Sequence, residues 1–132
     1  MSVMLVDLQD RDHTFPVNSY GWRGILEAVR RLNVVDEETI DGLHEPFTGS
    51  GLDAAQAETV AEAIEERLLP LLDEDDYLLL DGTITRTLPP KESQWMIIAR
   101  QYRVDVARYY TSAAWLRKFV AYCRSCSGFW VG

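Results

Sequence analysis

The feature that most constrains the fold is a set of apolar residues that recur at the spacing of a helix. They follow a capping residue, Asn18 or Ser19, at positions i, i+3, i+4, i+7 and i+10. These residues are Trp22, Ile25, Leu26, Val29 and Leu32. The spacing predicts an amphipathic helix with one buried stripe. Because such a helix is stable only when its apolar side is covered, the chain must build a shared core.

Two further stripes predict helices. Asp53 and Gln56 have the spacing of a capping box, with Asp in place of Ser or Thr. The inward side of that helix is expected to hold Ala57, Val60, Ala61, Ile64, Leu68 and Leu71. Pro70 should kink or end it, since proline lacks an amide proton. The other helix is capped by Thr111 or Ser112, and its buried side is expected to hold Trp115, Leu116, Phe119, Val120 and Cys123.

Further elements complete the prediction. A short helix is expected over Asp36–Leu43, because acids favour a helix N-terminus, and a long one over Trp95–Tyr109 from its helical spacing. Ser2–Leu8 and Phe129–Val131 read as strands. Two segments around the turn signal Asp81-Gly82 predict a hairpin, namely Tyr77–Leu80 and Thr83–Leu88, although the first is also compatible with a buried helical tail.

The order of these elements predicts one α+β domain over residues 1–132. In it, about four helices pack with a small antiparallel sheet that includes the N- and C-terminal strands. The hydrophobic share of 47% is enough for a packed core, and no run of 18 apolar residues or secretory signal is visible. We therefore expect a cytoplasmic protein that does not enter membranes.

Charge is divided unevenly along the chain. Residues 1–83 hold 19 Asp and Glu against 5 Arg, whereas residues 84–132 hold 8 Lys and Arg against 2 acids, all of the basic ones within 86–124. The acidic part exceeds the basic part, which disfavours nucleic-acid binding. It favours a basic protein partner, whose approach it would accelerate by electrostatic steering. The alternative is that the acids only keep the protein soluble.

The most concentrated acids follow the capping-box helix. Its outward side carries Glu58, Glu62, Glu65 and Glu66. Asp73–Asp76 then places four acids at the helix C-terminus, where the macrodipole is unfavourable to them. This run is a candidate partner-facing segment, and a solvated loop is the alternative.

Few residues suggest chemistry. Cys123 and Cys126 form a CxxC pair, but it lies at a helix end and the only other soft ligands are the separate His13 and His44. No metal or cofactor is expected, and Cys123 reads as a small core residue. The carboxylates fall on outer faces, where solvation keeps their pKa values ordinary, so no general acid or base stands out. Trp22, Trp95 and Trp115 lie on core stripes, and Trp130 lies on a terminal strand.

Three stretches carry a resemblance. They are Phe15–Leu26 (FPVNSYGWRGIL), Thr48–Ala57 (TGSGLDAAQA) and Phe119–Phe129 (FVAYCRSCSGF). They resemble a group of small, largely uncharacterised bacterial proteins in which a strand leads to a Trp-containing helix and the last helix ends in a Gly-Phe strand. Relative to that group, Tyr77–Tyr110 looks like an insertion. Members of this kind often resemble immunity or antitoxin proteins encoded beside toxins, and the resemblance implies no catalytic residue.

The expected function is therefore that of an acidic immunity-type inhibitor, not an enzyme, that binds a basic toxin domain and occludes its active site. Tyr77 is the expected aromatic anchor beside the acids. The expected partner-binding residues are Glu62, Glu65, Glu66, Asp73, Glu74, Asp75, Asp76 and Tyr77. The alternatives are a small enzyme or ligand-binding domain with a pocket between helices and terminal strands, and a metal-binding regulator that uses the two cysteines.

Overall fold

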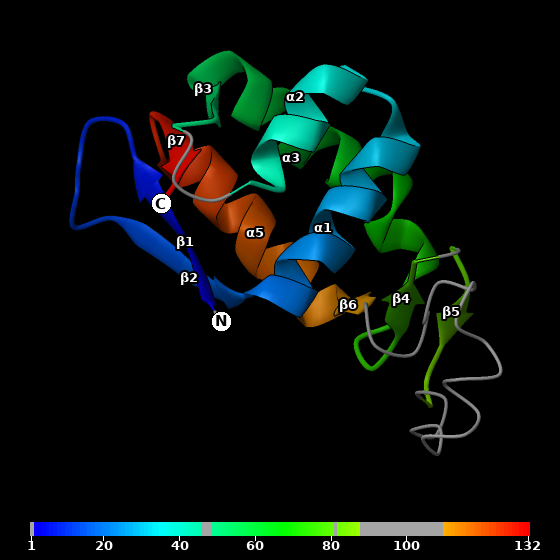
Figure 1. The fold of residues 1–132 in the computed structure, drawn as a ribbon. Coiled ribbons are helices and arrows are strands. Elements are labelled where there is room, and N and C mark those ends of the chain that lie inside the picture. The colour runs from blue at the N-terminus through cyan, green and yellow to red at the C-terminus, as the bar shows by residue number, and fades with distance from the viewer. Residues whose placement is uncertain (1, 46–48, 81, 88–109) are drawn as a thin grey trace, which may run out of the picture.

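A computed structural model describes residues 2–45, 49–80, 82–87 and 110–132. Within them the chain forms helices and two small antiparallel sheets, which confirms the α+β class (Figure 1). The strands predicted near the two ends of the chain pair with each other, as Leu5 lies opposite Val131. The predicted helix over Trp95–Tyr109 lies outside the described residues.

Sheet A contains both terminal strands. Its order is β2-β1-β7-β3, and every neighbouring pair is antiparallel. The strands are β1 (Ser2–Asp7), β2 (Thr14–Asn18), β3 (Gly51–Asp53) and β7 (Gly128–Val131). Along β1, Val3, Leu5 and Asp7 are buried in alternation, so the strand presents one face to the core.

Sheet B contains the predicted hairpin and one more strand. Its order is β5-β4-β6, from β4 (Tyr77–Leu79), β5 (Ile84–Thr85) and β6 (Tyr110–Ser112). Leu78 lies opposite Ile84 on one side and Thr111 on the other. The hairpin is thus confirmed over these residues, and the reading of Tyr77–Leu80 as a helical tail is wrong.

The helices begin at the predicted caps. They are α1 (Ser19–Leu32), α2 (Glu37–Leu43), α3 (Ala54–Arg67), the 3-10 turn η1 (Leu69–Leu71) and α5 (Ala113–Ser125). Asn18 accepts a hydrogen bond from the Gly21 amide at 2.6 Å, and Ser112 accepts one from the Trp115 amide at 3.1 Å. Asp53 and Gln56 form the complete capping box. These caps satisfy amides that a helix start otherwise leaves unpaired.

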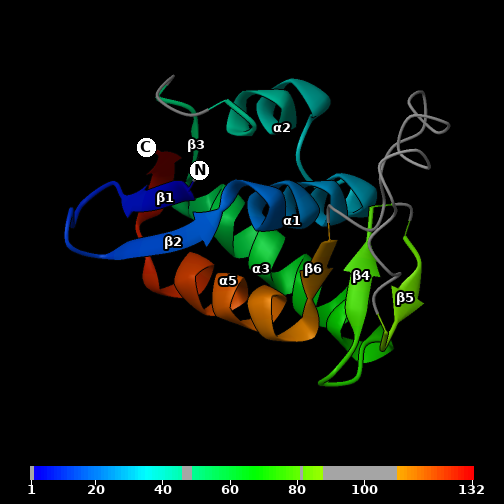
Figure 2. The same cartoon turned by 60° about the horizontal axis from the view of Figure 1, so that its bottom comes forward.

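The long helices form a layer between the two sheets (Figure 2). Helix α3 packs against both α1 and α5, and β6 packs against α1. One core joins the layer to both sheets, because its buried residues include Leu5 of sheet A, Ile25 of α1, Phe119 of α5 and Leu78 of sheet B. The arrangement brings the loop between β1 and β2 next to the C-terminal end of α5.

Two predicted core positions are wrong. Leu71 is 63% exposed, because α3 ends at Arg67 and η1, with Pro70 in it, turns the chain out of the helical register. Trp115 is 36% exposed, and its ring lies on the edge of the apolar stripe of α5. Leu116, which was predicted on the same buried side, is fully buried.

Candidate functional site

The predicted partner-binding acids of α3 differ in their surroundings. Glu62 and Glu66 are exposed and form no ion pair within the described part of the chain. Glu65 is half-buried, and one of its oxygens lies 2.7 Å from Arg124 Nη1 of α5. Arg124 also lies 3.4 Å from Glu58. Part of the acidic face is therefore neutralised by the basic end of the same chain.

The run Asp73–Asp76 is divided in the same way. Asp76 is buried, and its carboxylate accepts a hydrogen bond from the Asp73 amide at 2.8 Å. Asp73 lies 2.7 Å from Arg86 Nη2, an exposed pair. Glu74 and Asp75 are exposed and make no ion pair with any described residue. Asp76 thus shapes the turn, and the two middle acids are exposed without an ion pair in the described part of the chain.

The predicted aromatic anchor takes part in sheet B. The Tyr77 ring is half-buried and meets the Tyr110 ring edge to face, with centroids 5.4 Å apart. Leu71, four residues before Asp75, is the most exposed of the large apolar side chains that the structure describes. An apolar side chain is therefore available beside the acids, although it is not the predicted one.

A second site was not predicted, and it begins with a buried carboxylate. Asp7 is 4% exposed and occupies an inward position of β1. Its oxygens accept hydrogen bonds from the amides of Gln9 at 2.9 Å and Ser127 at 3.3 Å. The Gln9 hydrogen bond lowers the pKa of Asp7, burial opposes this, and contacts with His13 and Ser127 lower it further. The expectation that every carboxylate is a solvated surface group is therefore wrong for Asp7.

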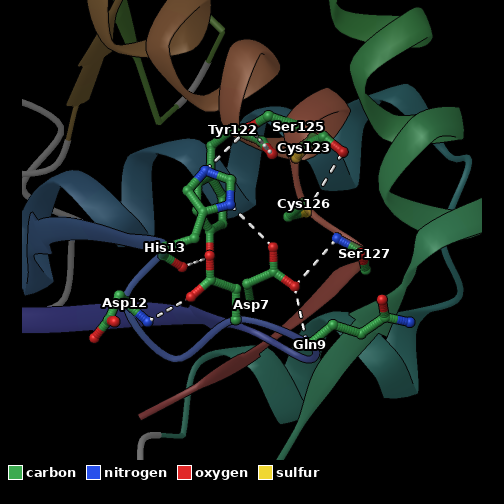
Figure 3. A network of polar contacts seen from close by, with 10 residues as sticks. Asp7, Gln9, Asp12, His13, Tyr122, Cys123, Ser125, Cys126 and Ser127 are labelled. Carbon is green, nitrogen blue, oxygen red and sulfur yellow. Dashed lines mark hydrogen bonds and ion pairs between the residues drawn. The ribbon is translucent and has the colours of Figure 1, made fainter.

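His13 connects this carboxylate to the end of α5. Its Nδ1 lies 2.9 Å from Asp7 Oδ2, and its Nε2 lies 3.1 Å from Ser125 Oγ (Figure 3). Ser125 Oγ also donates to the carbonyl oxygen of Tyr122 at 3.1 Å. The Tyr122 hydroxyl in turn donates to the His13 carbonyl at 3.0 Å. Asp7, His13 and Ser125 therefore form a continuous relay between sheet A and α5.

The oxygens of Asp7 and Ser125 restrict which hydrogen bonds His13 can donate. An ionised carboxylate can only accept, so His13 Nδ1 carries a proton. Ser125 has one proton, and if it goes to the Tyr122 carbonyl, Nε2 must donate to Ser125 Oγ. Both ring nitrogens of His13 therefore have an oxygen partner, and which of them donates depends on the tautomer.

The same three residue types form the catalytic unit of serine hydrolases, but the surroundings here differ. Those sites need amide donors for the developing oxyanion, and losing one donor lowers the rate about 100- to 1000-fold. The amides after Ser125 are already used, since Cys126 N donates to the Tyr122 carbonyl and Ser127 N donates to Asp7. The helix C-terminus also opposes negative charge. The geometry therefore supports proton handling and anchoring better than acyl transfer.

The cysteines lie beside this relay. Cys123 is buried, as predicted, and burial raises the pKa of its thiol. Cys126 is half-buried, burial also raises its pKa, and its thiol donates to the Cys123 carbonyl at 3.5 Å. Within the described ranges no three His, Cys, Asp or Glu side chains are grouped so that they could hold a metal ion. His44, for example, lies beside Glu27 at 3.6 Å.

An open pocket of about 590 Å³ lies between β2 and α5, next to the relay. His13 and Ser125 border it at one end, and Lys118 lines another part. Its wall is mostly aromatic, from Phe15, Trp115 and Tyr122. Its volume lies in the range of small-molecule sites, and it is open to solvent on one side.

One sequence signal pointed to the missed relay. Asp7 follows Val3 and Leu5 at the inward positions of a predicted strand, and a buried carboxylate requires hydrogen-bond donors. The identity of those donors had no local signal, because Ser127 and Ser125 are more than a hundred residues away in the sequence.

Comparison with known proteins adds no assignment. No family model matches the chain, and no curated protein or solved structure matches it either. None of the helices in the described ranges is sufficiently long and apolar to traverse a bilayer.

Proposed function

We propose that this chain is an acidic inhibitor of the immunity type, which binds a basic toxin domain and occludes its active site. The observation that carries the proposal is Leu71. Its side chain is 63% exposed, and it precedes in sequence the exposed Glu74 and Asp75, which form no ion pair with a described residue. An apolar side chain beside free carboxylates has the composition of a binding hot spot for a basic surface.

Leu71 is exposed although the residue that follows it is buried in the core. The next residue, Leu72, is 6% exposed and belongs to the core. Full burial of a leucine against a partner contributes about 1.5–3 kcal/mol. A partner that covers Leu71 therefore recovers free energy that folding of this chain alone leaves unused.

The free acids supply the long-range attraction. Glu62 and Glu66 are exposed on α3, one helical turn apart, and precede the turn that holds Glu74 and Asp75. The net charge of −8 adds to this field. Attraction of this kind raises the association rate more than it slows dissociation. The other predicted acids make contacts within the chain. Glu65 pairs with Arg124 of α5, and Asp73 pairs with Arg86. Asp76 accepts a hydrogen bond that holds the turn.

The test uses the product of the gene adjacent to that of this chain, purified as its catalytic domain. Glu74→Gln with Asp75→Asn should lower the association rate constant about tenfold at low salt and flatten its salt dependence. Leu71→Ala should raise the dissociation rate constant instead. Stopped-flow fluorescence measures both, and inhibition of the toxin is assayed in parallel.

The matched control is Asp12→Asn with Glu38→Gln, which removes the same charge from exposed sites on other elements. It should leave association close to wild type. An equal loss in both double variants would mean that only net charge matters. A neighbouring product that does not bind, or that binds without loss of its activity, would contradict the immunity assignment.

A further inference from the structure

The pocket between β2 and α5 has a continuous aromatic wall. The Phe15 ring meets the Trp115 ring nearly at right angles, with centroids 5.8 Å apart, and lies 5.5 Å from the Tyr122 ring. Trp115 is 36% exposed, although its ring is large enough to contribute strongly to a core. The exposed part of this ring lines the pocket, so an apolar ligand would bury surface that the fold leaves in contact with water.

The pocket also carries a cation that forms no ion pair with any acid of the described residues. Lys118 Nζ lies 4.9 Å from the centroid of the Trp115 ring, and no ion pair joins it to any acid among the described residues. The ring attracts the ammonium group, and the donors that point away from it remain available to an anion.

The end of the pocket away from Lys118 is polar because His13 and Ser125 border it. Ser125 is seven residues after Lys118 on α5, which separates their backbones by about 10 Å along the helix axis. Ser125 is exposed, and a third of the His13 side chain is accessible. Asp7 and the Tyr122 hydroxyl fix the position of His13, so the polar end is preorganised and needs no ordering when a ligand binds.

From these observations we propose that the pocket binds a small organic acid with a flat apolar body. The body packs against Trp115 and Phe15, the acid group pairs with Lys118, and Ser125 hydrogen-bonds a polar group at the other end. A peptide fits less well, because the exposed Pro16 leaves β2 without one amide donor and an incoming strand could not pair with it fully. This site is separate from Leu71 and the acids around it.

The test uses two fluorescent probes that share one ring system. The first is 8-anilinonaphthalene-1-sulfonate, an aromatic anion, and the second is N-phenyl-1-naphthylamine, which lacks the sulfonate. We expect one saturable site per folded chain. Lys118→Gln should weaken binding of the sulfonate about fivefold and leave the neutral probe unchanged. Trp115→Ala should weaken binding of both probes.

The matched control is Arg117→Gln, which removes the same charge from the adjacent exposed position of α5. It should leave both affinities unchanged. Equal losses in Arg117→Gln and Lys118→Gln would overturn the proposal, as would sulfonate binding that Lys118→Gln does not alter or binding of several probes per chain. Near-ultraviolet circular dichroism confirms that each variant retains its tertiary packing.

Discussion

At the scale of single residues, the buried Asp7 carboxylate joins three separate segments of the chain. It accepts hydrogen bonds from the loop after β1, from the residue before β7, and from His13. A buried carboxylate is costly without donors, and each donor that loses its acceptor is also left unsatisfied. Asp7 therefore holds the β1–β2 loop and the end of α5 together.

Asp7→Asn should lower the free energy of unfolding by about 1–3 kcal/mol, because the neutral amide is a weaker acceptor and presents an amino group to at least one donor. Urea denaturation at pH 7 measures the loss. His13→Ala should lower the free energy of unfolding less in the Asp7→Asn background than it does in the wild-type protein. Additive losses in the double variant would show that the relay does not act as a unit.

The lowered pKa of Asp7 predicts a pH dependence. Since this pKa is lower in the folded protein than in the unfolded chain, the unfolded chain binds the proton first as the pH falls. The stabilisation is complete above the unfolded value, near 3.8, and is lost as the pH falls below it towards the folded value. Urea midpoints between pH 5 and pH 2 should fall less steeply for Asp7→Asn than for wild type. Parallel curves would contradict this.

At the scale of elements, the close approach of α1 and β6 joins the helical layer to sheet B. A Cβ atom added at Gly24 of α1 would lie 2.5 Å from the Tyr110 carbonyl carbon and oxygen of β6. Both are backbone atoms, which cannot move away as a flexible side chain can. The glycine therefore sets the distance at which the helix and the strand pack.

Gly24→Ala should destabilise the protein by about 1–3 kcal/mol through overpacking, although alanine is the better helix former by about 1 kcal/mol. Gly21→Ala on the same helix is the control, because its Cβ would meet only side-chain atoms of Asn18 and Val17, at 3.2 Å. Thermal unfolding should show a clearly larger loss for Gly24→Ala. Equal or reversed effects would mean that β6 moves freely away from α1.

The elements also show what the sequence allows one to predict. The helices α1, α3 and α5 were predicted because each has a capping residue at its start and an apolar stripe that continues over three or more turns. The strands β2, β3 and β6 were missed, because segments of three to five residues, one with Pro16 and one with Gly51, have no readable alternation. Their pairing comes from tertiary contacts with strands distant in the sequence.

At the scale of the whole molecule, the candidate sites depend on contacts of very different range. The acids of α3 could be predicted from their helical spacing alone. Arg124 of α5 neutralises some of them across 59 residues, and the relay joins His13 to Ser125 across 112. Which acids of α3 are paired depends on the packing of α3 against α5. The contact between His13 and Ser125 likewise depends on the packing of the β1–β2 loop against α5.

The shared core predicts cooperative unfolding of the described residues. Buried residues of sheet A, of the helical layer and of sheet B belong to one cluster, so loss of one part exposes the others. Urea transitions followed by far-ultraviolet circular dichroism and by tryptophan fluorescence should coincide. Two separate midpoints would show instead that sheet B and its surroundings form an independent unit.

The place of β7 in sheet A has a consequence for biosynthesis. This strand is translated long after β1 and β3, yet it lies between them and pairs with both. At about 5–20 residues per second, β1 waits roughly 6–26 s for its neighbour. Sheet A therefore cannot be completed until β7 has been translated and has left the ribosome exit tunnel. Until then the inward residues of β1 are accessible to chaperones.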